Sequence, residues 1–306
     1  MKRWVEKTDR RSFEPIQINR ADHRFLTELL TQEIFIAMGF SPDGLVRRLL
    51  KPVVNIPVSR FSRIAVQFDR LSGEVGFSAA CRQILPFFIK GLNIERPVEP
   101  PREGSLLLVS NHPGAVDSLI LAGMVQRRDL KIIASGVPFM RALPKAAESL
   151  IYASLDIGER VRVIRDAIKH LRSGGALVLL PSGRIDPDPL VMSGAEDALN
   201  SWSSSVGLFV RSVPGLQIII AVVGGVLSPR ILKTPLTGFG NTRMQKQRIA
   251  EFVQVLQQMV FPRSITIMPR VHFSDPFTVA SIGERSSEEI TREIVCRARS
   301  ILQSAF

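Results

Sequence analysis

A histidine and an aspartate stand five positions apart in the stretch "SNHPGAVDS" at 110–118. An imidazole exchanges a proton near neutral pH, and a carboxylate within reach fixes its tautomer and stabilises the imidazolium. His112 and Asp117 are therefore candidates for general-base catalysis. The alternative is an ordinary loop histidine that the aspartate merely caps, because an H-x4-D pattern alone is common by chance.

No activated nucleophile accompanies this pair in the sequence. A Gly-x-Ser-x-Gly motif is absent, and the two cysteines, Cys81 and Cys296, lie too far apart to suggest a disulfide framework or a cysteine-based zinc site. The repeat "DPDP" (186–189) offers paired carboxylates, but a proline after each aspartate is more typical of a rigid turn than of a metal site. No zinc spacing relates the four histidines: His23, His112, His170 and His272. We therefore expect no metal, and a nucleophile that belongs to the substrate.

The histidine stretch lies where a predicted strand gives way to a predicted helix, and this alternation continues through the rest of the chain. Apolar runs predict strands at 105–110, 130–135, 175–181, 216–228 and 264–274. Helical patterns occupy 117–126, 158–174, 196–212, 243–261 and 286–305. Together they indicate an α/β fold with a mainly parallel sheet covered by helices. In such folds ligands bind at the carboxyl ends of the strands.

Local signals suggest how this junction is built. We expect Asn111 to cap the helix, Pro113 to occupy its first turn, and Asp117 to reach back toward His112.

The first hundred residues differ from the rest. Amphipathic helices are predicted at 24–40 and 63–92, with a proline-containing extended connection at 51–61. The stretch "RPVEPPREG" (96–104) marks a boundary. We therefore divide the chain into an N-terminal helical, membrane-binding segment (1–100) and an α/β domain (101–306).

The charge of the chain points to an anionic partner. The formal net charge is +12, and no Asp or Glu occurs between Ala198 and Ala250. Nucleic acid is not expected, because no motif interleaves aromatic with basic residues. The basic residues of this stretch form either a solvated face or a surface for lipid head groups or donor phosphates: Arg211, Arg230, Lys233, Arg243, Lys246 and Arg248.

The sequence also predicts where the protein works. The charged start "MKRWVEKTDRR" lacks the apolar run of a secretory signal. The apolar stretch 212–229 is interrupted by Pro214 and glycines, which favours a buried strand over a membrane span. We expect a peripheral protein on the cytoplasmic face of a membrane.

Several motifs resemble those of the glycerolipid acyltransferase superfamily, which includes lysophosphatidic acid and glycerol-3-phosphate acyltransferases. "NHPGAVD" is similar to its N-H-x4-D motif, and "LVLLPSGRIDPDPLVMSGA" (177–195) is similar to its Phe-Pro-Glu-Gly-Thr-Arg-Ser block and the turn after it. The stretches 130–144 and 216–229 resemble its second and last motifs. The likeness covers residues 63–229, about half of the chain.

The resemblance implies an acyltransferase that moves a fatty acyl group from acyl-CoA or acyl carrier protein to a hydroxyl or amine of a lysophospholipid-type acceptor, without a cofactor. It makes His112 the base and Asp117 its orienting partner. Backbone N–H groups near Gly183 would stabilise the oxyanion. Substrate contacts are expected from five residues: Asn111, Pro181, Ser182, Gly183 and Arg184. A non-catalytic lipid-binding protein and a thioester hydrolase are the alternatives.

The sequence departs from the family pattern in several places, two of them in the loop at 182–184. Ser182 replaces the family's glutamate, and Arg184 follows Gly183 directly instead of one position later. Since those family residues are thought to hold the acceptor's phosphate and glycerol, we expect an acceptor other than glycerol 3-phosphate.

Overall fold

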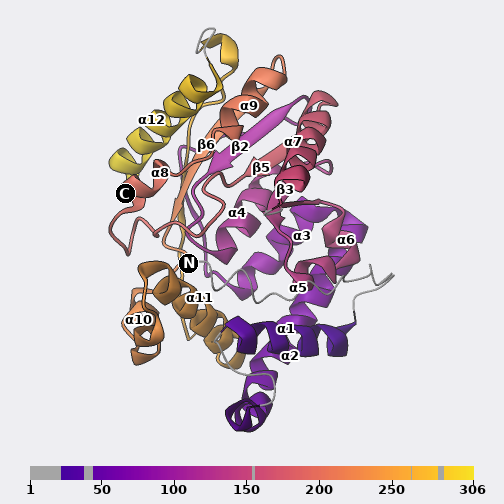
Figure 1. The fold of residues 1–306 in the computed structure, drawn as a ribbon, viewed down its shortest axis with the longest axis vertical. Helices are drawn as coiled ribbons and strands as arrows, with labels where there is room; N and C mark the ends of the chain where they lie inside the picture. The colour runs from indigo at the N-terminus through magenta and orange to yellow at the C-terminus, as the bar shows by residue number, and fades with distance from the viewer. Residues whose placement is uncertain (1–21, 38–43, 154–155, 263, 282–285) are drawn as a thin grey trace.

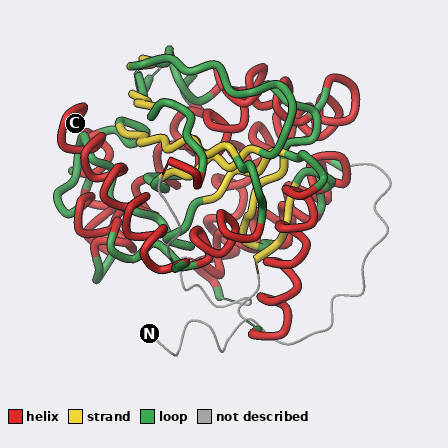
Figure 2. Tube along the Cα trace, turned by 90° about the horizontal axis from the view of Figure 1, so that it is seen from above, coloured by secondary structure: helices red, strands yellow, loops and turns green. Residues whose placement is uncertain are grey.

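Seven strands form one sheet at the centre of the computed structural model, with helices on both faces (Figures 1 and 2). The described residues are 22–37, 44–153, 156–262, 264–281 and 286–306. In chain order the strands are β1 (Asn93–Glu95), β2 (Leu106–Ser110), β3 (Lys131–Ser135), β4 (Leu150–Ala153), β5 (Ala176–Leu179), β6 (Gln217–Gly224) and β7 (Arg270–Phe273). Their order in the sheet is β1-β7-β6-β2-β5-β3-β4, and only β6 and β7 pair antiparallel. The predicted fold class is confirmed.

Twelve α-helices lie in the described part of the chain. They are α1 (His23–Ala37), α2 (Leu45–Val75), α3 (Phe77–Ile84), α4 (Ala115–Val125), α5 (Pro138–Arg141), α6 (Pro144–Ala147), α7 (Ile157–Arg172), α8 (Ala195–Leu199), α9 (Ser205–Ser212), α10 (Pro229–Leu232), α11 (Arg243–Val260) and α12 (Ser287–Ala305). Short 3₁₀ turns occur at Leu85–Phe87, Pro235–Phe239 and Val279–Ser281.

The central strand β2 separates two apolar cores because successive side chains of a strand point to opposite faces. Leu106 and Leu108 pack into the core beneath α3 and α4. Leu107 and Val109 pack into the core beneath α7, α9 and α12. All five residues of β2 are buried, as expected for a central strand of a parallel sheet. This double cover makes β2 a rigid support for the loop that follows it.

The extended connection predicted at 51–61 is wrong. Helix α2 runs through Pro52 and Pro57 and ends only at Val75. Each proline removes one hydrogen bond of the helix interior, but packing against α1, α3, α6 and α11 holds the helix together. Val58, 2 % exposed, and Ser62, 0 % exposed, lie in the part that packs.

Two other elements are shorter than predicted. The helix expected at 196–212 is divided into α8 and α9 by a turn in which Trp202 is buried and the Ser203 N–H donates to the Pro181 carbonyl oxygen. The strand expected at 264–274 is limited to β7. Strands β1 and β4 were not expected, because three or four residues are too few to show a period.

The apolar run at 212–229 forms the buried strand β6, as predicted. None of the helices in the described residues is long and apolar enough to cross a bilayer. The division at residue 100 stays a prediction. In the structure β1 pairs with β7, and α3 is buried in the same core as α4.

Candidate active site

His112 and Asp117 meet where β2 ends and α4 begins. The chain leaves the sheet after Ser110, turns through Pro113, and enters α4 at Ala115. Asp117 lies in the first turn of α4, so its side chain reaches back toward the strand. Its Oδ2 and Oδ1 lie 2.9 and 3.1 Å from His112 Nδ1. The predicted contact is confirmed.

Asp117 is held firmly while one side of the imidazole stays open. The aspartate is 0 % exposed and accepts hydrogen bonds from the Gly114 N–H (2.9 Å) and the Ser118 hydroxyl (3.0 Å). Because its carboxylate accepts from Nδ1–H, the other ring nitrogen of neutral His112 carries the lone pair. Nε2 has no hydrogen-bond partner among the described residues. With the His112 side chain 24 % exposed, that nitrogen is available to a substrate.

The loop after β5 is tied to the His112 loop by Asp186. The Asp186 carboxylate accepts from the His112 backbone N–H (2.9 Å), and the Asp186 backbone N–H donates to the His112 carbonyl oxygen (2.7 Å). Asp186 is 2 % exposed, and its Oδ1 has no hydrogen-bond partner within the described part of the chain. The two motif loops are thus fixed to each other through His112.

Asp188, two residues later, braces a third loop. Its carboxylate accepts hydrogen bonds from the backbone N–H groups of Leu190 (3.0 Å), Gly225 (2.7 Å) and Leu227 (3.1 Å). These contacts use the carboxylate for backbone support, as the rigid-turn interpretation of "DPDP" implies. Among the described residues no cluster of histidine, cysteine and carboxylate side chains is suited to a metal ion.

Helix α11 reaches the same site from the other end of the sequence. The Gln247 amide donates to the carbonyl oxygens of Pro113 (2.8 Å) and Asp186 (2.7 Å). One turn later, Glu251 Oε1 accepts from the Ala115 N–H (2.8 Å). A Cβ at position 114 would overlap the Glu251 carboxylate, so the glycine of "NHPGAVD" allows this approach.

Three carboxylates determine the charge of His112. Burial alone would lower the pKa of the imidazole, but the charge and hydrogen bond of Asp117, with the charges of Glu251 and Asp186, outweigh burial and raise the pKa to about 9. Burial raises the pKa of Glu251 to about 7 and the pKa of Asp186 to about 6. The backbone hydrogen bond that each carboxylate accepts lowers its pKa, but by less than burial raises it. The three carboxylates therefore stabilise the imidazolium that forms when Nε2 takes a proton.

The residues expected to contact substrate divide into two groups. Asn111 is 2 % exposed; its amide donates to the Val223 carbonyl oxygen and its Oδ1 accepts from the Val223 N–H, both at 2.8 Å. Asn111 therefore joins β2 to β6. It does not cap α4, because the residue directly before that helix is Gly114, so the expected cap is wrong. Pro113 lies before the helix and not in its first turn. Pro181 is buried as well. Both were expected to meet substrate; both are buried, and the Asn111 side chain bonds to the backbone of β6, which gives it a supporting role.

The second group forms an accessible loop. Gly183 and Arg184 are exposed, Ser182 is partly exposed, and Gly183 has a left-handed φ of 62° that favours glycine. The Ser182 hydroxyl donates to the Arg184 carbonyl oxygen (2.8 Å). The Gly183 N–H donates to the Leu180 carbonyl oxygen (3.1 Å), so this amide does not point freely at a substrate as the oxyanion interpretation required.

Sequence reasoning missed three residues of the site. Asp186 stood inside a quoted motif, but only the folded structure brings it to the His112 backbone. Gln247 and Glu251 lie in a predicted helix more than 130 positions after His112, and no local spacing connects them to it. A polar side chain on the inward face of an amphipathic helix was the available signal.

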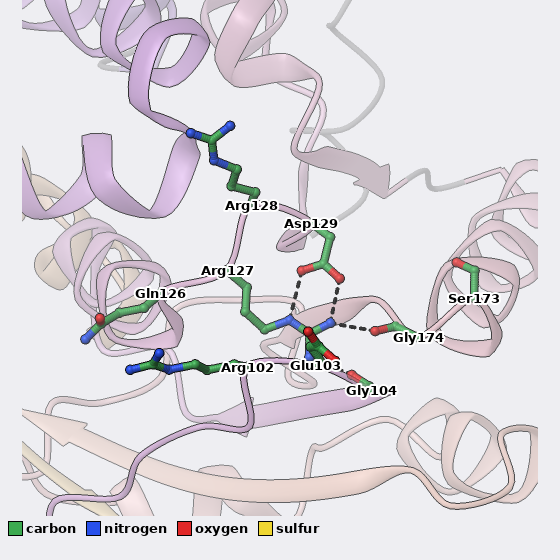
Figure 3. Close-up of a pocket in the computed structure, with 9 residues that line it drawn as sticks. All are labelled: Arg102, Glu103, Gly104, Gln126, Arg127, Arg128, Asp129, Ser173 and Gly174. Atoms are coloured by element: carbon green, nitrogen blue, oxygen red, sulfur yellow. Dashed lines mark hydrogen bonds and ion pairs between the residues drawn. The ribbon is translucent and has the colours of Figure 1, made fainter.

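A charged hollow of about 410 Å³ lies at the opposite edge of the sheet, where β2, β3 and β5 begin (Figure 3). Its buried Arg127 faces Asp129 and the Gly174 carbonyl oxygen. Arg127 also donates to the Gly104 carbonyl oxygen. These bonds join three loops, which gives the arginine a structural role.

No protein-family model matches this chain, and neither does any curated protein sequence. Among solved structures, the crystal structure of the 1-acyl-sn-glycerophosphate (LPA) acyltransferase PlsC from Thermotoga maritima is similar, with 13 % identity and a TM-score of 0.44. The alignment covers 92 % of this chain and 97 % of that one.

Proposed function

We propose that this protein is an acyltransferase that moves a fatty acyl group from a thioester, acyl-CoA or acyl carrier protein, to a hydroxyl or amine of a lysophospholipid-type acceptor. The observation that carries this proposal is the His112–Asp117 pair, with Nδ1 bonded to a fully buried carboxylate and Nε2 open. No described side chain bonds to Nε2 as an enzyme nucleophile would. A base with no nucleophile of its own suits a reaction in which the second substrate attacks.

In the proposed mechanism His112 Nε2 takes the proton of the acceptor hydroxyl as its oxygen attacks the thioester carbonyl carbon. The new C–O bond forms, the C–S bond breaks, and the imidazolium returns its proton to the departing thiolate. Asp117 takes no proton; it holds Nδ1–H and stabilises the imidazolium between the two transfers. The ester and the free thiol are the products, and no cofactor enters the balance.

The acceptor is proposed to meet the accessible loop at 182–184. Arg184 is exposed, and a guanidinium matches a phosphate or carboxylate in two-pronged geometry. Ser182 supplies no negative charge to compete for that arginine. These features favour an acceptor that has an anionic group and is other than glycerol 3-phosphate.

We propose that the protein works peripherally at the cytoplasmic face of a membrane. The first half of α2 carries an exposed apolar stripe at helical spacing, formed by Leu49 (69 % exposed), Val53 (67 %) and Ile56 (56 %). Exposed Arg48 and Lys51 flank it, and this part of α2 extends below the body in Figure 1. An apolar stripe beside basic residues suits the interface of an anionic bilayer.

Labelled acyl-CoA and acyl carrier protein, incubated with the protein and a total lipid extract, would test the reaction. We expect labelled lipid, identified by mass, and thioester loss that depends on the acceptor. Acceptor-independent release of free fatty acid would make the protein a thioester hydrolase. If the thioester stays intact with every acceptor while lipid still binds, the protein is a lipid-binding relative without turnover.

A further inference from the structure

Helix α11 carries a row of buried or half-buried polar side chains along one face. Its members follow a spacing of four, three and four residues, which places them on one side of a helix: Gln247, Glu251, Gln254 and Gln258. Each bonds to the backbone of a neighbouring segment: Gln247 and Glu251 to the turn that leads into α4, Gln254 to the loop after β6, and Gln258 to the turn after α3. Glu251 is the charged member of the row, and it lies beside the candidate base.

Glu251 and Asp117 accept hydrogen bonds from consecutive backbone amides of the same turn. The Gly114 N–H donates to Asp117 Oδ2 (2.9 Å), and the next amide, of Ala115, donates to Glu251 Oε1 (2.8 Å). These amides open α4, where the positive end of the helix dipole stabilises negative charge. The turn that carries His112 is thus fixed by one carboxylate from α4 and one from α11.

We propose that Glu251 is a positioning residue for His112: it holds the first turn of α4 and, through its charge, stabilises the imidazolium. This inference rests on the proposed function for its kinetic consequences only, because the charge of His112 can be measured without turnover. Glu251 touches no reacting atom in the proposed mechanism. It acts through the backbone and through the electric field at the imidazole.

The charged groups around the pair decide the direction of the effect. His112 faces Asp117 from its own turn, Asp186 from the loop after β5, and Glu251 from α11. Arg248, one turn before Glu251, is the positive group whose charge acts on that carboxylate. Removing the Glu251 charge leaves the imidazolium with less stabilisation, so the neutral base must form at lower pH. Because these groups titrate together, the midpoint measured at His112 belongs to the cluster.

A histidine NMR titration tests the proposal. The protein is labelled at its histidine rings, His112 is assigned through the His112→Ala variant, and the ring C–H shift is followed against pH. Glu251→Gln keeps an oxygen for the Ala115 N–H but removes the charge. We expect it to lower the His112 midpoint by about 1 pH unit, a tenfold change in the acid constant. Glu103→Gln, the same change at the opposite edge of the sheet, should leave the midpoint where it is.

Kinetics adds the second readout. The acid limb of kcat/KM should move to lower pH in Glu251→Gln by the same amount as the NMR midpoint. Glu251→Ala, which also removes the hydrogen bond, should show this shift with a severalfold lower kcat. An unchanged His112 midpoint in Glu251→Gln would overturn the proposal, even if Glu251→Ala lost activity. If wild type transfers no acyl group, the proposed function fails, while the NMR result still decides the role of Glu251.

Discussion

At the residue scale, His112 is fixed at two points. Asp117 binds its ring through Nδ1, and Asp186 binds its backbone N–H. The ring contact was predictable because both residues lie in one short turn. The backbone contact and the approach of Glu251 were not, since they depend on how separate loops and helices are placed on the sheet.

Two substitutions test the base directly. His112→Ala removes the proton acceptor, and Asp117→Asn replaces an acceptor of three hydrogen bonds by an amide that no longer fixes the Nδ1–H tautomer. Each should reduce kcat by roughly 10²–10⁴-fold, the contribution of general-base catalysis. Steady-state assays would measure this loss, with circular dichroism as the check that both variants fold. Turnover close to wild type in either one contradicts the mechanism.

The acceptor preference is tested in the loop after β5. Arg184→Ala should raise KM for an anionic acceptor more than it lowers kcat, because the arginine binds substrate and touches no reacting bond. Ser182→Glu should weaken the binding of the same acceptors, because the new carboxylate would pair with Arg184 in their place. Acyl-transfer assays in which several acceptors compete, run on wild type and on both variants, would measure these changes. Preference of the wild type for glycerol 3-phosphate, or an Arg184→Ala variant with no KM changed, would count against the acceptor proposed here.

At the element scale, loops from three parts of the chain are held together by buried polar side chains. Asp188 braces the turn after β6, Gln247 joins the two motif loops, and Asn111 continues the pairing of β2 with β6 beyond Ser110. The alternation of apolar runs predicted the elements themselves. The contacts between the loops at the ends of these elements could not be predicted, because a side chain that bonds to a distant backbone group leaves no periodic signal in the sequence.

Asn111 tests this distinction between support and substrate binding. In Asn111→Ala the buried N–H and carbonyl oxygen of Val223 lose both partners, so the free energy of unfolding should fall by about 1–3 kcal/mol. Urea denaturation measures the change, and the midpoint should move with little change in its slope. KM should change little for protein that remains folded. A raised KM with unaltered stability would restore Asn111 as a substrate contact.

At the scale of the whole molecule, charge and exposed apolar surface set the expected partner. The chain has a net charge of +12, and the six basic residues of its acid-free stretch are all exposed, where their charge can meet an anionic partner: Arg211, Arg230, Lys233, Arg243, Lys246 and Arg248. The sequence predicted this surface and the two-faced sheet. It did not predict the uninterrupted α2. Two prolines locally favour a break, and only packing against four other helices (α1, α3, α6 and α11) overrides them.

The membrane proposal is tested with vesicles, because an apolar stripe and a positive surface respond differently to salt. Wild type should sediment with anionic vesicles, bind neutral ones weakly, and lose affinity as salt screens the charges. Replacing Leu49, Val53 and Ile56 by serine removes apolar contact while leaving every charge in place. This variant should bind anionic vesicles more weakly at all salt concentrations, whereas Phe261→Ser, a matched exposed apolar change outside α2, should bind as wild type does. Equal binding to neutral and anionic lipid would contradict an electrostatic contribution to membrane binding. A triple variant that binds like wild type would contradict the proposed contact between α2 and the membrane.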